Sequence, residues 1–85
     1  VVGEIIKSSQ ANSDDTVLEI GPGEGVMTEE LLKICNRVIA IEKDERLIPI
    51  LKDKFSKEIE QNKLYVLEED ILDFDLKNIK EKYKI

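Results

Sequence analysis

The sequence predicts an α/β fold in which helices cover both faces of a parallel sheet. Short apolar runs suited to strands alternate with segments whose apolar residues recur at helical spacing, and a glycine-rich turn at residues 21–25 joins the first run to a helix. This alternation requires right-handed crossovers, which place the parallel strands in the order 3-2-1. Strand 1 would then be an uncovered edge, so we expect the sheet to continue into a missing strand 4.

The length and charge of the chain limit what it can be. Eighty-five residues fit at most one small domain, and a chain this short buries only about 60–65% of the surface that it exposes when unfolded, so residues 1–85 are interpreted as part of a domain. The first residue is Val1 instead of Met, which favours a piece of a longer protein. The net charge of -6 repels a nucleic-acid backbone, so any basic nucleic-acid-binding face is expected outside these residues.

Cysteine and histidine usage argues against several kinds of site. Cys35 is the one cysteine and there is no histidine, so neither an intrachain disulfide nor a Cys/His metal site is expected. This composition fits a reducing, cytoplasmic setting. Cys35 is interpreted as a small buried apolar residue of a helix. No apolar run approaches the roughly 20 residues that span a bilayer, so no membrane partner is expected.

The first half of the chain is expected to contain two helices around one strand. A helix is predicted to extend to about Ser9, with four apolar residues on one face: Val1, Val2, Ile5 and Ile6. After a polar turn, the first strand is expected at Thr16 to Ile20. The helix after the glycine turn is expected to end at Asn36. Its apolar stripe is formed by Met27, Leu31, Leu32 and Cys35.

The second strand is expected at Val38 to Ile41, where four apolar residues without alternation are typical of a strand buried on both faces. A second helix is expected to begin near Glu45 after an Asp44 cap, or to be slightly kinked, because Pro49 lacks a backbone N–H. A charged continuation extends it to Gln61. Its apolar face is formed by Leu47, Ile48, Ile50, Leu51 and Phe55.

The third strand is expected at Leu64 to Leu67, after a turn at Asn62 and Lys63. It runs into three carboxylates: Glu68, Glu69 and Asp70. A loop or short helix should follow and lead to a fourth strand at Tyr83. The apolar residues that anchor this loop or helix are Ile71, Leu72, Phe74, Leu76 and Ile79.

The glycine turn is where the sequence predicts a ligand. Glycine reaches φ > 0 at little cost and, without a Cβ, lets a ligand approach the backbone, while the following helix presents unpaired N–H groups and the positive end of its dipole. Glu19, Glu42 and Asp70 end three successive strands, at the edge of a parallel sheet where ligands bind. Glu42 lies roughly 20 residues after Gly21, a spacing at which a carboxylate accepts both hydroxyls of a ribose.

Two ligand classes compete for this turn. A nicotinamide or flavin dinucleotide favours Gly-x-Gly-x-x-Gly, but Val26 stands at the third glycine of that pattern and Glu24 would oppose the pyrophosphate. The Gly-x-Gly-x-Gly pattern with Glu19 two residues before it instead suits a ligand with an amino-acid zwitterion and a ribose. The dinucleotide is therefore the less favoured alternative.

Residues 19–25, Glu-Ile-Gly-Pro-Gly-Glu-Gly, and the Met-Thr-Glu-Glu-Leu of residues 27–31 resemble motif I of S-adenosylmethionine-dependent methyltransferases, and more narrowly that of ribosomal RNA adenine dimethyltransferases. Residues 39–47 are similar to the family's second motif and residues 69–74 to its third. The resemblance covers nearly the whole chain. It implies a Rossmann-like, class I methyltransferase fold, of which residues 1–85 would be a partial S-adenosylmethionine-binding domain.

The resemblance also implies how the cofactor, S-adenosyl-L-methionine, is held. The backbone of Gly21, Gly23 and Gly25 would bind its methionine portion, and Glu42 would bind the ribose hydroxyls. Glu19 would organise the turn and reach the cofactor's amino group, or would brace the turn only, and both readings stay open.

The remaining implied contacts concern the adenine bases. Asp70 and the backbone of Ile71 would read the adenine of the cofactor. The family's Asn-(Leu/Ile)-Pro-(Tyr/Phe) motif, which positions the target adenine, is not in the chain, and neither is the family's basic segment before the first helix. No residue is therefore assigned a catalytic role.

These implications predict the cofactor-binding part of an rRNA adenine N6,N6-dimethyltransferase. The longer protein would be a cytoplasmic monomer that acts on ribosomal RNA of the small ribosomal subunit and needs no metal, and the present chain alone is expected to be inactive. The alternatives are a class I methyltransferase with a different substrate and, from a different class, a non-catalytic piece that binds protein and ignores adenosine ligands.

Overall fold

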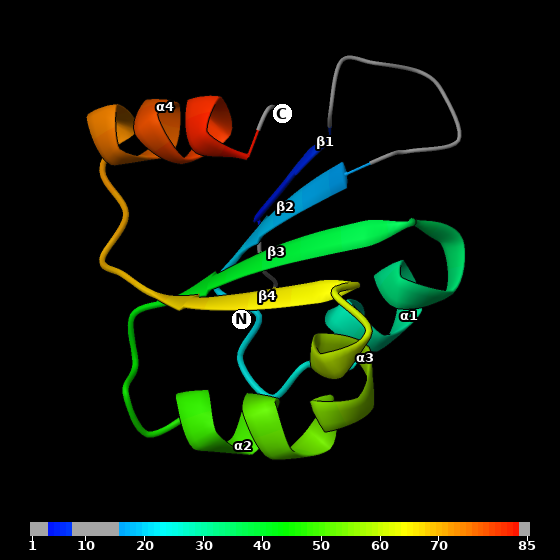
Figure 1. Ribbon diagram of the computed structural model, residues 1–85. Coiled ribbons are helices and arrows are strands. Elements are labelled where there is room, and N and C mark those ends of the chain that lie inside the picture. The colour runs from blue at the N-terminus through cyan, green and yellow to red at the C-terminus, as the bar shows by residue number, and fades with distance from the viewer. Residues whose placement is uncertain (1–3, 8–15, 84–85) are drawn as a thin grey trace.

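The computed structural model describes residues 4–7 and 16–83, which form four strands and four helices (Figure 1). In chain order these are β1 (Glu4–Lys7), β2 (Thr16–Ile20), α1 (Val26–Ile34), β3 (Arg37–Glu42), α2 (Ile48–Lys54), α3 (Ser56–Glu60), β4 (Leu64–Glu68) and α4 (Asp73–Lys82).

The strands form one sheet in the order β1-β2-β3-β4. The strands β2, β3 and β4 are parallel, with Val17 opposite Val38 and Val38 opposite Leu64. The predicted positions of these three strands and their 3-2-1 order are confirmed. Their carboxyl ends meet at one edge of the sheet, because all three run in the same direction.

The N-terminal segment differs from the prediction. Glu4–Lys7 is not helical but forms β1, which pairs antiparallel with β2 so that Ile5 lies opposite Glu19. The other residues of the predicted helix, 1–3 and 8–9, lie outside the described residues. Four apolar residues in a short window fit either a helix or a strand, and here the unpaired backbone groups of β2 decide in favour of the strand. The expectation of an uncovered edge at β2 was wrong for the same reason.

Helices cover both faces of the sheet, as predicted. The helices α1, α2 and α3 lie on one face and α4 on the other (Figure 1). The α1–α3 face has a buried cluster formed by Val17, Leu31, Val38, Ala40, Leu51, Phe55 and Leu64. The α4 face has a smaller one formed by Leu18, Ile39, Ile41 and Ile79. Alternate residues of β2 and β3 enter the two clusters, which explains why Val38 to Ile41 of β3 is a continuous apolar run.

The second predicted helix is two helices. The helix α2 begins at Ile48, later than the predicted Glu45, with Leu47 instead of Asp44 at the N-cap and Pro49 in the first turn, where no hydrogen bond is lost. It ends at Lys54, and the φ of -113° at the C-cap Phe55 interrupts the helical path before α3. Ile50 is 47% exposed and so does not belong to the apolar face.

Other element ends differ less. The helix α1 ends at Ile34, with Cys35 at the C-cap, slightly before the predicted stop at Asn36. Cys35 is half-buried and packs against the larger cluster. The predicted turn before β4 is confirmed, since Asn62 has a φ of 61°. The predicted fourth strand at Tyr83 is wrong, because α4 extends to Lys82 and Tyr83 is its C-cap. None of the helices in the part of the chain that is described is long and apolar enough to cross a membrane.

Candidate functional site

The glycine turn between β2 and α1 is built from residues in the left-handed region. The φ angles of Gly21, Gly23 and Gly25 are 73°, 61° and 91°. The Gly21 N–H donates to the Ile41 carbonyl oxygen at 2.8 Å and the Gly25 N–H to the Pro22 carbonyl oxygen at 2.9 Å. The first bond ties the turn to the end of β3 and the second closes the turn on itself.

The three glycines face different surroundings. A Cβ at Gly25 would lie 2.6 Å from Cε2 of Phe55 and 3.2 Å from Cδ2 of Leu51, whereas a Cβ at Gly21 or Gly23 would meet nothing within 4 Å. Gly25 therefore lets α1 start directly against α2, and it does so from a buried position. Gly21 and Gly23 leave open space on the side of the ends of β2 and β3, which is where a ligand could reach the backbone.

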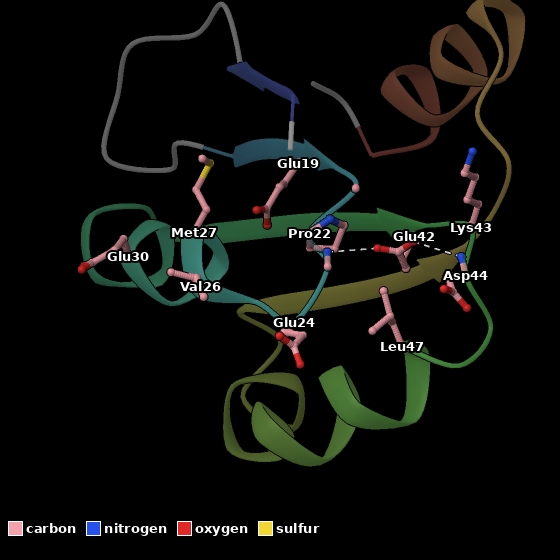
Figure 2. Close-up of a pocket in the computed structure, with 12 residues that line it drawn as sticks. Glu19, Pro22, Glu24, Val26, Met27, Glu30, Glu42, Lys43, Asp44 and Leu47 are labelled. Carbon is pink, nitrogen blue, oxygen red and sulfur yellow. Dashed lines mark hydrogen bonds between the residues drawn. The ribbon is translucent and has the colours of Figure 1, made fainter. Parts of the chain in front are cut away.

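This open space is part of a cavity of about 910 Å³. It lies between the glycine turn, the start of α1 and the loop after β3 (Figure 2). Its lining consists of Glu19, Gly21, Pro22, Gly23, Glu24, Val26, Met27, Glu30, Glu42, Lys43, Asp44 and Leu47. The volume is in the range of pockets that enclose small-molecule ligands and cofactors.

Glu42 is fixed at the edge of this cavity by backbone donors. It is 5% exposed, and its Oε1 accepts the Gly23 N–H at 3.0 Å while its Oε2 accepts the Asp44 N–H at 3.0 Å (Figure 2). A carboxylate oxygen has two lone pairs, so each oxygen keeps one for a ligand. The carboxylate is thereby oriented to accept two further hydrogen bonds side by side, as a vicinal diol would donate them.

Glu19 is the second carboxylate of the cavity and is fully buried. Its Oε1 accepts a hydrogen bond from the Thr28 hydroxyl, while its Oε2 has no partner among the described residues. Burial raises the pKa of Glu19, and the hydrogen bond from Thr28 offsets part of that rise. An unpaired buried oxygen beside a cavity fits a ligand group that donates a hydrogen bond, above all a cationic one.

Asp70 and Ile71 follow β4 but do not line the cavity. The end of β4 is joined to β3 by the Glu69 N–H, which donates to the Glu42 carbonyl oxygen at 3.0 Å. Asp70 is exposed, and Ile71 packs against the cluster on the α4 face. Of the predicted site residues, the cavity therefore brings together Glu19, Gly21, Gly23 and Glu42, and the ligand roles of all seven stay predictions.

Across residues 1–85 the chain matches the family model of the ribosomal RNA adenine dimethylases. The chain belongs to this family. It is 36% identical over 83 residues to the ribosomal RNA small subunit methyltransferase A of Mycoplasma capricolum, which covers 98% of the chain. It is 40% identical over 77 residues, or 91% of the chain, to the protein of that name from Ligilactobacillus salivarius. It is 39% identical over 75 residues, or 88% of the chain, to a mitochondrial ribosomal RNA small subunit methyltransferase of Arabidopsis thaliana.

The aligned parts are a minor share of these dimethylase-family relatives. They amount to 30% of the Mycoplasma protein, 25% of the Ligilactobacillus protein and 20% of the Arabidopsis protein. The chain thus spans at most about a third of the length of the curated relatives that it matches. The fold and the family of the chain are therefore shown, whereas the activity of the whole protein is treated below as a proposal.

Some residues in or behind the cavity were assigned no ligand role from the sequence. Thr28 does not line the cavity but is fully buried, and its hydroxyl donates to the carboxylate of Glu19, which does line it. Met27 and Leu47 were predicted as helix-packing residues, yet both line the cavity. The one sequence signal was the polar Thr28 in the first turn of an otherwise amphipathic helix, which has to find a partner when it is buried.

The loop after β3 is stabilised by a local ion pair that can be tested. Nη2 of Arg46 lies 2.9 Å from Oδ2 of Asp44, and hydrogen bonds from the Arg46 side chain and backbone lower the pKa of Asp44 to about 2. Replacing Arg46 with alanine is expected to raise the pKa of Asp44 toward its ordinary value of 3.8. Carboxyl-detected NMR titration measures this directly, and a pKa that stays near 2 in the variant would show that the Arg46 side chain is not the cause.

Proposed function

We propose that this chain is the S-adenosyl-L-methionine-binding part of an rRNA adenine N6,N6-dimethyltransferase. Its membership of the ribosomal RNA adenine dimethylase family supports the reaction class. The observation that carries the cofactor assignment is the pair of buried carboxylates on one cavity: Glu42 oriented by two backbone N–H groups, and Glu19 with one unpaired oxygen. Such a pair complements a ligand that has both a ribose diol and an ammonium group.

The ribose, the ammonium group and the methionine portion of the cofactor would each meet a complementary group at the cavity. The two outer lone pairs of Glu42 would accept the ribose hydroxyls, and Oε2 of Glu19 would accept an N–H of the α-ammonium. The backbone at Gly21 and Gly23 would lie against the methionine portion, since neither position has a neighbouring atom where a Cβ would stand. Gly25 would contribute through the packing of the turn on α2.

The adenine contacts are proposed from the resemblance. Asp70 and the backbone of Ile71 would bind the adenine ring, and both follow the strand that is hydrogen-bonded to the end of β3 through Glu69. The cofactor supplies an electrophilic methyl group on a sulfonium, which the N6 of an adenine would accept with loss of a proton. The residues of this chain orient the cofactor and shield it from water, and none of them is assigned a catalytic role.

The target and its surroundings are proposed on the same basis. The relatives named above are small-subunit ribosomal RNA methyltransferases, so we infer that the whole protein acts on ribosomal RNA of the small ribosomal subunit. That it does so as a monomer is a separate proposal. The chain's net charge of -6 is unfavourable for binding a phosphate backbone, so the RNA-binding face would lie in other parts of the protein. A cytoplasmic location is proposed from the composition, although one relative is named as mitochondrial.

A titration of the ¹⁵N-labelled chain with S-adenosylmethionine, and separately with NADH, tests the cofactor assignment. Saturable shifts of the Gly21 and Gly23 amides are expected with S-adenosylmethionine only, because Glu24 lines the cavity and would repel a pyrophosphate. Glu42→Ala should weaken binding at least about tenfold, since charge-assisted hydrogen bonds contribute about 1.5–3 kcal/mol each.

Glu68→Ala is the matched control for Glu42→Ala. Glu68 lies opposite Glu42 in the sheet but is exposed and does not line the cavity, so its loss should leave the affinity unchanged. Equal affinities for all three proteins would refute the proposed role of Glu42. A folded chain that ignores S-adenosylmethionine altogether would refute the cofactor assignment for this segment.

A further inference from the structure

Glu19 has a different environment from the other carboxylates of the cavity. It is 0% exposed, and its neighbours across the sheet are Ile5 on β1 and Ala40 on β3, both apolar. Glu24 and Glu30 are exposed, and both oxygens of Glu42 accept backbone N–H groups. Glu19 is therefore the least exposed carboxylate of this cavity, and it has one protein donor where the other buried carboxylate, Glu42, has two.

Among the side chains that the structure describes, no cation forms an ion pair with Glu19. The charged residues on the neighbouring elements are Glu4 and Lys7 on β1, Glu24 in the glycine turn, Glu29, Glu30 and Lys33 on α1, Arg37 and Glu42 on β3, and Lys43 and Asp44 directly after β3. On β1, Glu4 and Lys7 occupy the register positions opposite Ile20 and Val17 instead of Glu19. Figure 2 shows the Lys43 side chain directed away from Glu19. The charged residues that line the cavity are thus mainly acidic, and they disfavour a further negative charge in its interior.

A single hydroxyl group partly stabilises the ionised form of Glu19. Thr28 donates to Oε1, while Oε2 has no donor in the described chain. Burial therefore prevails, and the pKa of Glu19 is raised above its ordinary value of 4.5. A cationic donor placed against Oε2 would act in the opposite direction, because an adjacent opposite charge favours the carboxylate.

We propose that the carboxyl group of Glu19 releases a proton to solvent when a ligand's ammonium group enters the cavity, so that cofactor binding is coupled to proton release. The O–H bond of the free acid breaks, its electron pair stays on the carboxylate, and one N–H of the ammonium takes the place of the proton as the partner of Oε2. Glu19 thereby selects ligands that carry a free amino-acid moiety. The inference rests on the proposed function, because it takes S-adenosylmethionine as the ligand.

The same group makes the stability of the ligand-free chain depend on pH. Because the folded pKa is raised, the folded chain binds more protons than the unfolded chain between the two pKa values, so the free energy of unfolding falls as pH rises from about 4.5 through the raised pKa. Glu19→Gln keeps the shape of the neutral acid and should remove this dependence. A saturating ligand with an ammonium group should weaken it in the wild-type chain.

Isothermal titration calorimetry in two buffers of different ionisation enthalpy, phosphate and Tris, measures the protons released on binding. The ligands are S-adenosylmethionine, S-adenosylhomocysteine, which keeps the ammonium but has no sulfonium, and 5′-methylthioadenosine, which has no amino-acid moiety. At pH values between the titration of Glu19 in the complex and its titration in the free chain, we expect proton release by the first two ligands and none by the third. Glu19→Gln should abolish the release and weaken the first two ligands roughly tenfold or more, with 5′-methylthioadenosine unchanged.

The outcomes separate this inference from the proposed function. Binding without proton release, release by S-adenosylmethionine alone, or release by all three ligands would each overturn it, whereas absence of any binding would instead refute the cofactor assignment. If the Glu19→Gln protein does not fold, the proposal can still be tested by a second measurement on the wild-type chain. The ¹³C carboxyl resonance of Glu19 should titrate at a lower pH with S-adenosylhomocysteine bound than without it, and an unchanged titration would overturn the coupling.

Discussion

Replacing Gly25 with alanine is expected to unfold or severely destabilise the chain, whereas the same change at Gly23 should be tolerated. Both residues have a positive φ, which costs alanine about 1–2 kcal/mol. A Cβ at Gly25 would also come within 2.6 Å of Phe55 and 3.2 Å of Leu51, and overpacking of this kind costs about 1–3 kcal/mol more. The combined cost is a large part of the stability of a domain of this size.

The contribution of the contact can be separated from that of the backbone. Urea unfolding of the two alanine variants should give a larger loss of unfolding free energy for Gly25→Ala than for Gly23→Ala. Adding Phe55→Leu, which shortens the side chain facing Gly25, should recover part of the loss at Gly25 and none at Gly23. Equal losses for the two glycines, or no coupling with Phe55, would show that backbone strain alone accounts for the effect.

A Gly25→Ala variant that remains folded is informative about the site. Gly25 closes the turn through its bond to Pro22, and Lys54 at the end of α2 donates to the Glu24 carbonyl oxygen at 3.3 Å. The glycine turn is thus held against α2 as well as against β3. Displacing it would move the Gly23 N–H from Oε1 of Glu42, so loss of packing should also reduce ligand affinity.

The parallel strands could be predicted because each is buried on both faces. A continuous apolar run such as Val38 to Ile41 is needed only where both sides of a strand are covered, and the two clusters provide that cover. The edge strand could not be predicted in this way. Residues 4–7 lie at the margin of the sheet, where pairing with β2 determines the conformation and the local pattern fits a helix equally well.

The site was partly predictable for a similar reason. Glycines and strand-end carboxylates follow from local sequence and from the parallel order of the strands, so Gly21, Gly23 and Glu42 could be placed at one edge. What needed the structure was tertiary contact: Thr28 as the partner of Glu19, and the approach of Phe55 that explains Gly25. Neither contact is encoded in the spacing of the residues involved.

The adjacent residues Ile50 and Leu51 show where helical periodicity fails, and they allow a direct test. Both were assigned to the apolar face of the second helix, but Leu51 is 0% exposed whereas Ile50 is 47% exposed. Leu51→Ala should lower the unfolding free energy by about 2–5 kcal/mol, because the space left in the cluster would refill only partly. Ile50→Ala should change it by no more than about 0.5 kcal/mol, since little packing is lost and alanine favours the helix.

Urea unfolding of the two variants tests whether Ile50 is exposed, as in the structure, or packs on the sheet, as the helical periodicity predicts. The volume-conserving Leu51→Met, expected to cost less than about 1.5 kcal/mol, serves as the reference if Leu51→Ala is already unfolded in the absence of urea. Equal destabilisation at both positions would mean that α2 is rotated so that Ile50 also packs on the sheet. The side chain of Leu51 lies next to Gly25, so such a rotation would also change the packing beneath the glycine turn. A much larger loss of stability for Leu51→Ala than for Ile50→Ala would therefore also support the geometry of the cavity.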